Sequence, residues 1–153
     1  MRIPATALLR SPQGETEWER YYDLRWRVLR EPWGQPRGSE RDELEPEAFH
    51  LAVWDVAGEP IAVGRLHTNS PSEAQVRFMA VDPRFKGWGL GTRVLAGLEK
   101  RARDLGVETV VLNAREEARG FYRRHGYEEI GAAPTLFGAI LHFTMKKAIC
   151  FAQ

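Results

Sequence analysis

The segment Gln75–Leu105, QVRFMAVDPRFKGWGLGTRVLAGLEKRARDL, holds a cluster of three glycines between two stretches of different pattern. Before the glycines, the apolar and β-branched run 76–81 predicts a β-strand, which must end by Pro83 because proline has no N–H to donate to a sheet. After them, apolar residues recur at helical spacing up to Gly106, which predicts a helix over 90–105. The expected order is therefore strand, glycine loop and helix.

A helix N-terminus that follows such a loop suits an anionic ligand. The N–H groups of the first turn have no partner within the helix, and the helix dipole places a partial positive charge there. Glycine at positions 87, 89 and 91 lets a phosphate approach the backbone without a Cβ in the way, and Lys86 adds a full charge. We interpret the loop as a pyrophosphate site; the alternative is a tight strand-to-helix turn without a ligand.

Two common phosphate motifs do not fit this loop. A nucleotide P-loop needs lysine and a hydroxyl residue after the last glycine, and the dinucleotide fingerprint needs glycine where the chain has Thr92. The loop instead resembles the Arg/Gln-x-x-Gly-x-Gly/Ala motif of the GNAT superfamily of acyl-CoA-dependent N-acyltransferases, with Lys86 in the basic position. The stretch 118–127, ARGFYRRHGY, is similar to that family's Ala-x-x-Phe-Tyr-x-x-x-Gly-Phe/Tyr. Two motifs in the right order are more specific than either alone.

Length and composition indicate one globular domain. The chain has 153 residues, 43% hydrophobic and 28% charged, so we expect a single GNAT domain over 1–153. Its 22 basic and 21 acidic residues give a net charge of +1, so neither nucleic acid nor an anionic membrane is an expected partner. No run reaches the ~20 apolar residues of a membrane span, and we expect a cytoplasmic protein without a metal site.

The pattern along the rest of the chain predicts an α/β fold. A helix is expected over 16–30, where Thr16 and Glu19 have the spacing of a capping box, and another over 116–124. Strands are expected over 2–10, 50–56, 60–67, 75–81, 109–113, 127–130 and 138–147. Because a helix separates the strand at 109 from the strand at 75, these two should be parallel. The expected fold is a mixed, mostly antiparallel sheet flanked by helices, the GNAT acyl-CoA N-acyltransferase fold.

The resemblance implies an N-acetyltransferase with acetyl-CoA as its cofactor. Such an enzyme transfers the acetyl group to a primary amine, of a small molecule or a protein, by direct attack through a tetrahedral intermediate. The resemblance also places the oxyanion donor on a backbone N–H near Ala80 or Val81, and it makes Tyr122 the general acid. The alternative for Tyr122 is an ordinary core aromatic. The implied cofactor-binding residues are Met79, Ala80, Val81, Lys86, Gly87, Trp88, Gly89, Leu90, Gly91, Thr92, Asn113 and Tyr122.

The chain departs from the family at one cofactor contact. Many members carry asparagine seven residues before the tyrosine, where this chain has Arg115; the nearest asparagine is Asn113, which would share a strand face with it. The general base also stays open. The candidates are His67, His50, Glu73 at the start of the central strand, and Glu31, Glu40 or Glu43 acting through water.

The acceptor is not specified by any motif. Trp33, Glu40 and Glu43 lie in the loop-like region 32–48, and their aromatic and acidic character would suit a cationic amine. A homodimer through the closing strand 138–147 is a further expectation. Two other functions compete with the enzyme: a catalytically silent acyl-CoA-binding sensor or partner module, and a mononucleotide-binding regulator.

Overall fold

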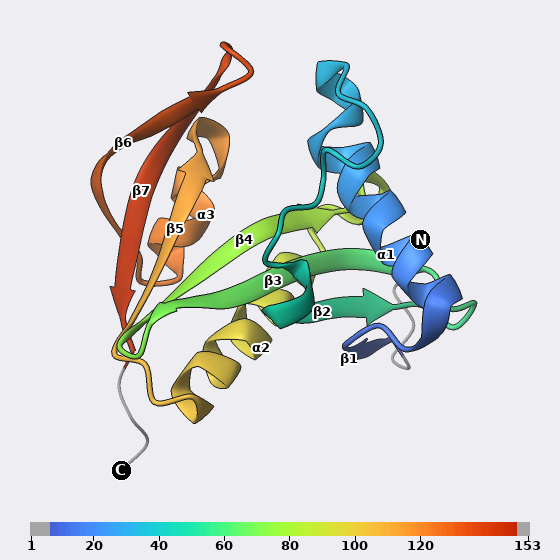
Figure 1. The fold of residues 1–153 in the computed structure, drawn as a ribbon, viewed down its shortest axis with the longest axis horizontal. Coiled ribbons are helices and arrows are strands. Elements are labelled where there is room, and N and C mark those ends of the chain that lie inside the picture. The colour runs from blue at the N-terminus through green and yellow to red at the C-terminus, as the bar shows by residue number, and fades with distance from the viewer. Residues whose placement is uncertain (1–6, 150–153) are drawn as a thin grey trace.

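The computed structural model describes residues 7–149, so most of the strand expected over 2–10 lies outside the described residues. One seven-stranded sheet has the order β1-β2-β3-β4-β5-β7-β6, and three α-helices pack against it (Figure 1). The strands are β1 Leu8–Arg10, β2 Phe49–Trp54, β3 Pro60–Ser70, β4 Glu73–Val81, β5 Thr109–Arg115, β6 Glu128–Leu136 and β7 Ile140–Ala148. The helices are α1 Gly14–Leu29, α2 Leu90–Asp104 and α3 Arg119–Arg124, with 3-10 turns η1 Glu31–Trp33, η2 Glu45–Glu47, η3 Pro83–Phe85 and η4 Glu116–Ala118. The predicted fold class is confirmed.

The two long helices cover opposite faces of the sheet. Leu90, Val94, Leu95 and Leu98 of α2 lie in the larger buried cluster, whereas Tyr21 and Leu24 of α1 lie in the smaller one. The apolar spacing that predicted the helix at 90–105 is thus the spacing of a core-facing stripe.

A β-bulge in β4 reverses which side chains face which helix. Phe78 has a positive φ of 57°, and the register jumps so that Phe78 and Met79 together face Gly64 of β3. Before the bulge, Val76 packs into the α2 cluster; after it, Phe78 and Ala80 pack into the α1 cluster. The bulge therefore leaves two consecutive side chains, Arg77 and Phe78, on the α1 side.

The sheet opens between its two parallel strands. β4 and β5 pair only from Glu73–Thr109 to Val76–Leu112, and they diverge beyond that register, as Figure 1 shows. We call β1–β4 with α1 and α2 the first arm, and β5–β7 with α3 the second arm. The divergence leaves an edge of β4 without a strand partner.

Three details of the predicted elements need correction: the start of α1, the place of β7 and the length of β6. Helix α1 begins at Gly14, and its first turn is closed by Glu17, whose carboxylate accepts the Gln13 N–H at 2.8 Å, not by the pair Thr16 and Glu19. The closing strand β7 lies between β5 and β6, so it has no free edge for a dimer; β6 is the edge and runs to Leu136. In the region 7–149, no helix is long and apolar enough to cross a membrane.

Candidate functional site

A cavity of about 420 Å³ fills the opening between the two arms, and we call it the notch. Its floor comes from β4 and β5, and its walls from the end of α1, from α3 and from the β6–β7 hairpin. The lining residues are Leu29, Arg30, Gln75, Val76, Arg77, Phe78, Met79, Leu112, Asn113, Ala114, Arg115, Ala118, Tyr122, Pro134, Leu136 and His142. Its charged side chains are arginines, with no carboxylate among the lining residues.

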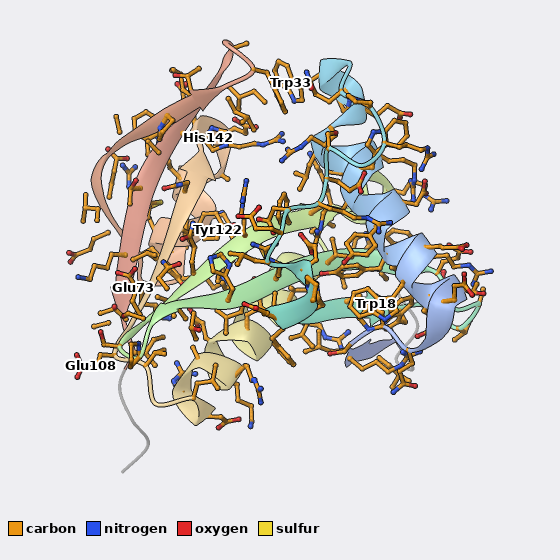
Figure 2. All side chains as sticks on the ribbon, in the orientation of Figure 1. Trp18, Trp33, Glu73, Glu108, Tyr122 and His142 are labelled. Atoms are coloured by element: carbon orange, nitrogen blue, oxygen red, sulfur yellow. The ribbon has the colours of Figure 1, made fainter. Side chains whose placement is uncertain are left out.

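Tyr122 presents a protonated hydroxyl to the notch. Its ring is 8% exposed and packs edge-on against Phe121 and Tyr127, with centroids 5.0 and 5.8 Å away. Burial raises the pKa of the phenol, and no hydrogen bond within residues 7–149 occupies the hydroxyl. Figure 2 shows Tyr122 on the second arm, beside the opening towards β4. A buried but unengaged phenol in a cavity can donate its proton to a ligand.

The glycine loop presents unpaired backbone N–H groups. Gly87 and Gly89 have φ of 83° and 76°, a left-handed conformation that favours glycine. The first helical bond of α2 runs from Arg93 N–H to Gly89 O at 3.1 Å, so the N–H groups of residues 90–92 have no helical partner. The loop thus has the backbone of the predicted anion site.

The N-terminus of α2 adjoins α3, which connects the glycine loop to the notch. A Cβ on Gly91 would stand 3.3 Å from Cζ of Phe121, the neighbour of Tyr122. The Thr92 hydroxyl bonds to Nε2 of His125 at 3.0 Å, so this side chain is already engaged and only its backbone N–H remains for a ligand. The start of α2 and the residue next to Tyr122 are therefore in contact.

The unpaired edge of β4 supplies further N–H groups. Asp82 donates its N–H to Ile61 O of β3 at 2.9 Å. Because N–H groups alternate along a strand, those of Val81 and Met79 point to the other edge, where β5 has diverged. Of the two residues that the resemblance favoured as oxyanion donor, Val81 and not Ala80 faces the notch side.

Asn113 and Arg115 share one face of β5, as predicted. The Asn113 carbonyl oxygen accepts the Thr144 hydroxyl at 2.9 Å, which leaves its amide N–H groups free to act as donors to a ligand. Arg115 reaches across the notch and donates to Leu29 O, at the end of α1, at 3.1 Å. Arg115 thus spans the notch from β5 to the end of α1.

Comparisons with known proteins assign this chain to a family. Residues 18–127 match the model of the Acetyltransferase (GNAT) family. The uncharacterized N-acetyltransferase YjcF of Bacillus subtilis (strain 168) is 32% identical over 112 residues, which are 73% of this chain and 79% of that protein. The chain belongs to the GNAT acetyltransferase family. Acetyl-CoA is the acyl donor of this family.

Solved GNAT structures share the fold over almost the whole chain. An aminoglycoside 6'-N-acetyltransferase complexed with coenzyme A superposes with a TM-score of 0.79 at 17% identity, covering 95% of this chain and 99% of that one. The ribosomal-protein-S18-alanine N-acetyltransferase of Escherichia coli gives 0.73 at 22% identity, with 97% of both chains covered. At these identities the likeness concerns the fold alone.

In this GNAT protein, neither candidate histidine is available as a base. Both ring nitrogens of buried His50 are engaged, by the Tyr21 hydroxyl at 2.9 Å and by Glu45 O at 2.9 Å. His67 does not line the notch; its Nδ1 accepts from Arg65 at 3.1 Å, and burial together with Arg65 lowers its pKa.

The candidate carboxylates also lie elsewhere. Glu73 accepts from Asn69 at 2.9 Å at the far end of β4 (Figure 2), and exposed Glu31 is outside the lining. Glu40 is 3% exposed and accepts the Gly38 N–H at 2.7 Å, and Glu43 lines a separate surface depression. Trp33 does not line the notch either, so none of Trp33, Glu40 and Glu43 contributes to the wall of this cavity.

His142, which no sequence motif singled out, does line the notch. Its Nδ1 lies 3.0 Å from Ile140 O, which can only accept, so Nδ1 carries a hydrogen, and in the neutral tautomer the lone pair is on Nε2. In the sheet it pairs with Arg115 of β5, and Figure 2 shows it on the same arm as Tyr122. The only sequence signal for His142 was its place in a closing strand that follows the Phe-Tyr motif. That strand could be assigned to the notch only once its pairing with β5 was known.

Proposed function

We propose that this protein transfers an acetyl group from acetyl-CoA to a primary amine, of a small molecule or a protein, bound in the notch, and that residues 1–153 form one GNAT domain. The observation that carries the proposal is the divergence of β4 from β5 next to the buried, unengaged hydroxyl of Tyr122. A thioester placed in that divergence would lie between unpaired backbone donors and a proton donor. Membership of the GNAT family supports acetyl transfer as the type of reaction.

The cofactor would bind along one continuous surface. Its pyrophosphate would accept hydrogen bonds from the backbone of residues 87–92, with Lys86 as counter-charge and exposed Trp88 beside the nucleotide. The pantetheine would lie along Met79, Ala80 and Val81 as an extra strand, using the donors that β5 leaves unpaired. The Asn113 amide would add a contact where the strands separate.

The reaction would use two side chains from the second arm. A neutral amine attacks the thioester carbonyl carbon, and His142 Nε2 takes the proton that the nitrogen loses. The negative charge on the carbonyl oxygen would be stabilised by the Val81 N–H, which points to the unpaired edge of β4. When the intermediate collapses, the C–S bond breaks, and the thiolate of coenzyme A takes the proton of Tyr122. His142 then releases its extra proton to solvent and Tyr122 takes one up from solvent, which completes the cycle.

The test is release of free thiol from acetyl-CoA with a panel of primary amines, together with calorimetric binding of coenzyme A. We expect both, and we expect Gly89→Glu to abolish them, because a carboxylate side chain would enter the anion site. Gly106→Glu is the matched control: Gly106 also has a left-handed φ, 79°, with nothing near its Cβ, but it follows the opposite end of α2. Binding of coenzyme A without thiol release for any amine would favour the silent sensor, and no binding would contradict the proposal.

A further inference from the structure

The acceptor side of the notch is lined by an excess of positive charge. Four guanidinium groups surround the ring of Phe78, at the bulge of β4. Their central carbons lie 4.3 Å (Arg25), 5.6 Å (Arg30), 4.9 Å (Arg65) and 4.5 Å (Arg77) from the ring centroid. Arg115 reaches the same region from β5. Four arginines are thus concentrated around one aromatic side chain, and Arg115 lies beside one of them, Arg30.

Two carboxylates form ion pairs within this cluster, and both pair with arginines of the first arm other than Arg30. Glu45 pairs with Arg25 at 2.9 Å and with Arg65 at 2.6 Å. Asp42 pairs with Arg65 at 2.6 Å and with Arg77 at 2.8 Å. These pairs leave Arg30 and Arg115 unneutralised.

Arg30 and Arg115 meet at one backbone oxygen. Arg30 Nη1 and Arg115 Nη2 donate to Leu29 O at 3.2 and 3.1 Å. Within residues 7–149, no carboxylate lies within 4.0 Å of either guanidinium group. Burial, and then the charges of Arg77 and Arg115, lower the pKa of Arg30 to about 10. Glu40 acts on Arg30 and Glu117 on Arg115 only from beyond ion-pair distance. Two cations held side by side without a directly paired carboxylate repel each other, and an anion between them would remove that repulsion.

The helix dipole and the cofactor phosphates do not account for this pair of arginines. A helix C-terminus attracts a cation, but its partial charge is about half a unit, so one arginine would satisfy it. The phosphates of coenzyme A do not reach this position, because the glycine loop lies outside the notch lining. The uncompensated charge therefore faces the space left for the acceptor.

We propose that the amine acceptor carries an oxyanion group, a carboxylate or a phosphate, and that Arg30 and Arg115 bind this group while the amine faces Tyr122 and His142. The inference rests on the acetyltransferase function proposed above. Guanidinium groups suit it because their planar N–H pairs match two oxygens of a carboxylate or phosphate. Leu29, Pro134 and Leu136 give the same cavity apolar walls. An amino acid or an amino-phosphate fits this description, and a polyamine does not.

Matched pairs of acceptors test the charge requirement. Leucine is compared with leucinamide, and O-phosphoethanolamine with ethanolamine, by kcat/KM for thiol release. We expect the anionic member of at least one pair to be preferred by ~10-fold or more, the usual value of a charge-assisted hydrogen bond. A preference within the leucine pair identifies the acceptor's anionic group as a carboxylate, and a preference within the ethanolamine pair identifies it as a phosphate. Since the amine of leucinamide is less basic than that of leucine, a preference for leucine cannot come from a larger neutral fraction.

A substitution of Arg115 tests whether the preference for an anionic acceptor comes from the proposed arginine pair. We expect Arg115→Gln to lower the preference ~10-fold, mainly through KM, whereas Arg27→Gln leaves it unchanged. Arg27 lies in the last turn of α1, is paired with Asp23 at 2.8 Å and does not line the notch. Arg115→Gln is preferred to Arg30→Gln because Arg115 makes one backbone hydrogen bond, so the fold is expected to survive, as a thermal melt will show.

A binding measurement separates this inference from the enzyme assignment. The same four compounds are titrated calorimetrically into protein loaded with coenzyme A, which needs no turnover. Tighter binding of an anionic compound, weakened in Arg115→Gln, supports the inference even if no thiol is released. Equal or tighter binding of both neutral compounds overturns it, even if thiol release with other amines supports the acetyltransferase.

Discussion

Tyr122 keeps its hydroxyl proton because burial disfavours the phenolate. If Tyr122 is the general acid, Tyr122→Phe should lower kcat ~100-fold or more while the affinity for coenzyme A stays unchanged. The raised pKa also has a consequence for the wild type: ionisation of Tyr122 should cause no loss of kcat between pH 8 and 10. Steady-state kinetics over that range and calorimetry check both points. Full kcat in Tyr122→Phe would assign Tyr122 to the core alone.

Gly64 of β3 is the residue that lets the bulge of β4 approach α2. A Cβ there would stand 2.6 Å from Sδ of Met79 and 2.7 Å from Cγ1 of Val94. We expect Gly64→Ala to cost about 1–3 kcal/mol through overpacking, which is ~2–10 °C in Tm for a chain of this size. Gly131→Ala is the control, because nothing lies near its Cβ and its φ is not positive. Equal melting temperatures for the two variants would contradict the role of Gly64.

The segment between α1 and β2 is held to the first arm by the carboxylates of Asp42 and Glu45. Burial opposes ionisation of Asp42, but the hydrogen bonds from Arg65 and the Leu44 N–H, together with the charges of Arg65 and Arg77, outweigh it, and the pKa falls to about 2 from 3.8. The ionised carboxylate therefore stabilises the fold above pH ~4, and this contribution is lost as the pH falls from ~4 towards 2. The segment should thus loosen in acid.

Asp42→Asn should remove that contribution at neutral pH. The expected loss in the free energy of unfolding is about 2 kcal/mol at pH 7, and the difference from the wild type should shrink as the pH approaches 2. Urea unfolding at several pH values measures it. A difference that stays constant down to pH 2 would show that the paired carboxylate is not its cause.

Sequence patterns predicted the elements whose own residues form a periodic or glycine-rich pattern. They missed the features that depend on how neighbouring strands pair. The run 76–81 and the stripe of α2 were visible because each is periodic, and the glycine loop because left-handed φ favours glycine. The bulge at Phe78 has no such signal, since a phenylalanine rarely adopts φ of 57°. The second half of β6 was missed because this edge strand is largely exposed.

The candidate site likewise contains residues that sequence motifs identified and residues that only the fold brings together. Tyr122 and the loop lie in contiguous motifs, so both were named from the sequence. The acidic residues of region 32–48 read as an acceptor site for a cation, but Asp42 and Glu45 neutralise arginines of three other elements. His142 of β7 and Arg30 after α1 line the same cavity only because the fold brings these distant elements together. Charge in a sequence therefore indicates the polarity of a site only once its ion pairs are known.

At the scale of the molecule, two interactions join the arms in addition to the Thr92–His125 and Arg115–Leu29 hydrogen bonds. One is the short parallel pairing of β4 with β5, and the other is Glu99 of α2. Buried Glu99 accepts the Tyr127 hydroxyl at 2.8 Å and pairs with Lys147 of β7 at 3.1 Å. Because the arms share one core cluster across α2, they should unfold together, as the proposed single domain requires.

Coenzyme A should strengthen this coupling, since the proposed binding surface uses both arms. At a free concentration 100 times its Kd, a ligand that binds only the folded state adds about 2.7 kcal/mol, or ~5–10 °C in Tm for a chain of this size. We expect one calorimetric transition that shifts as a whole. The Gly89→Glu variant should not shift, because the anion site is lost, whereas Gly106→Glu should shift like the wild type. Two transitions, of which coenzyme A moves only one, would show that the arms are separate units and that the cofactor binds one of them alone.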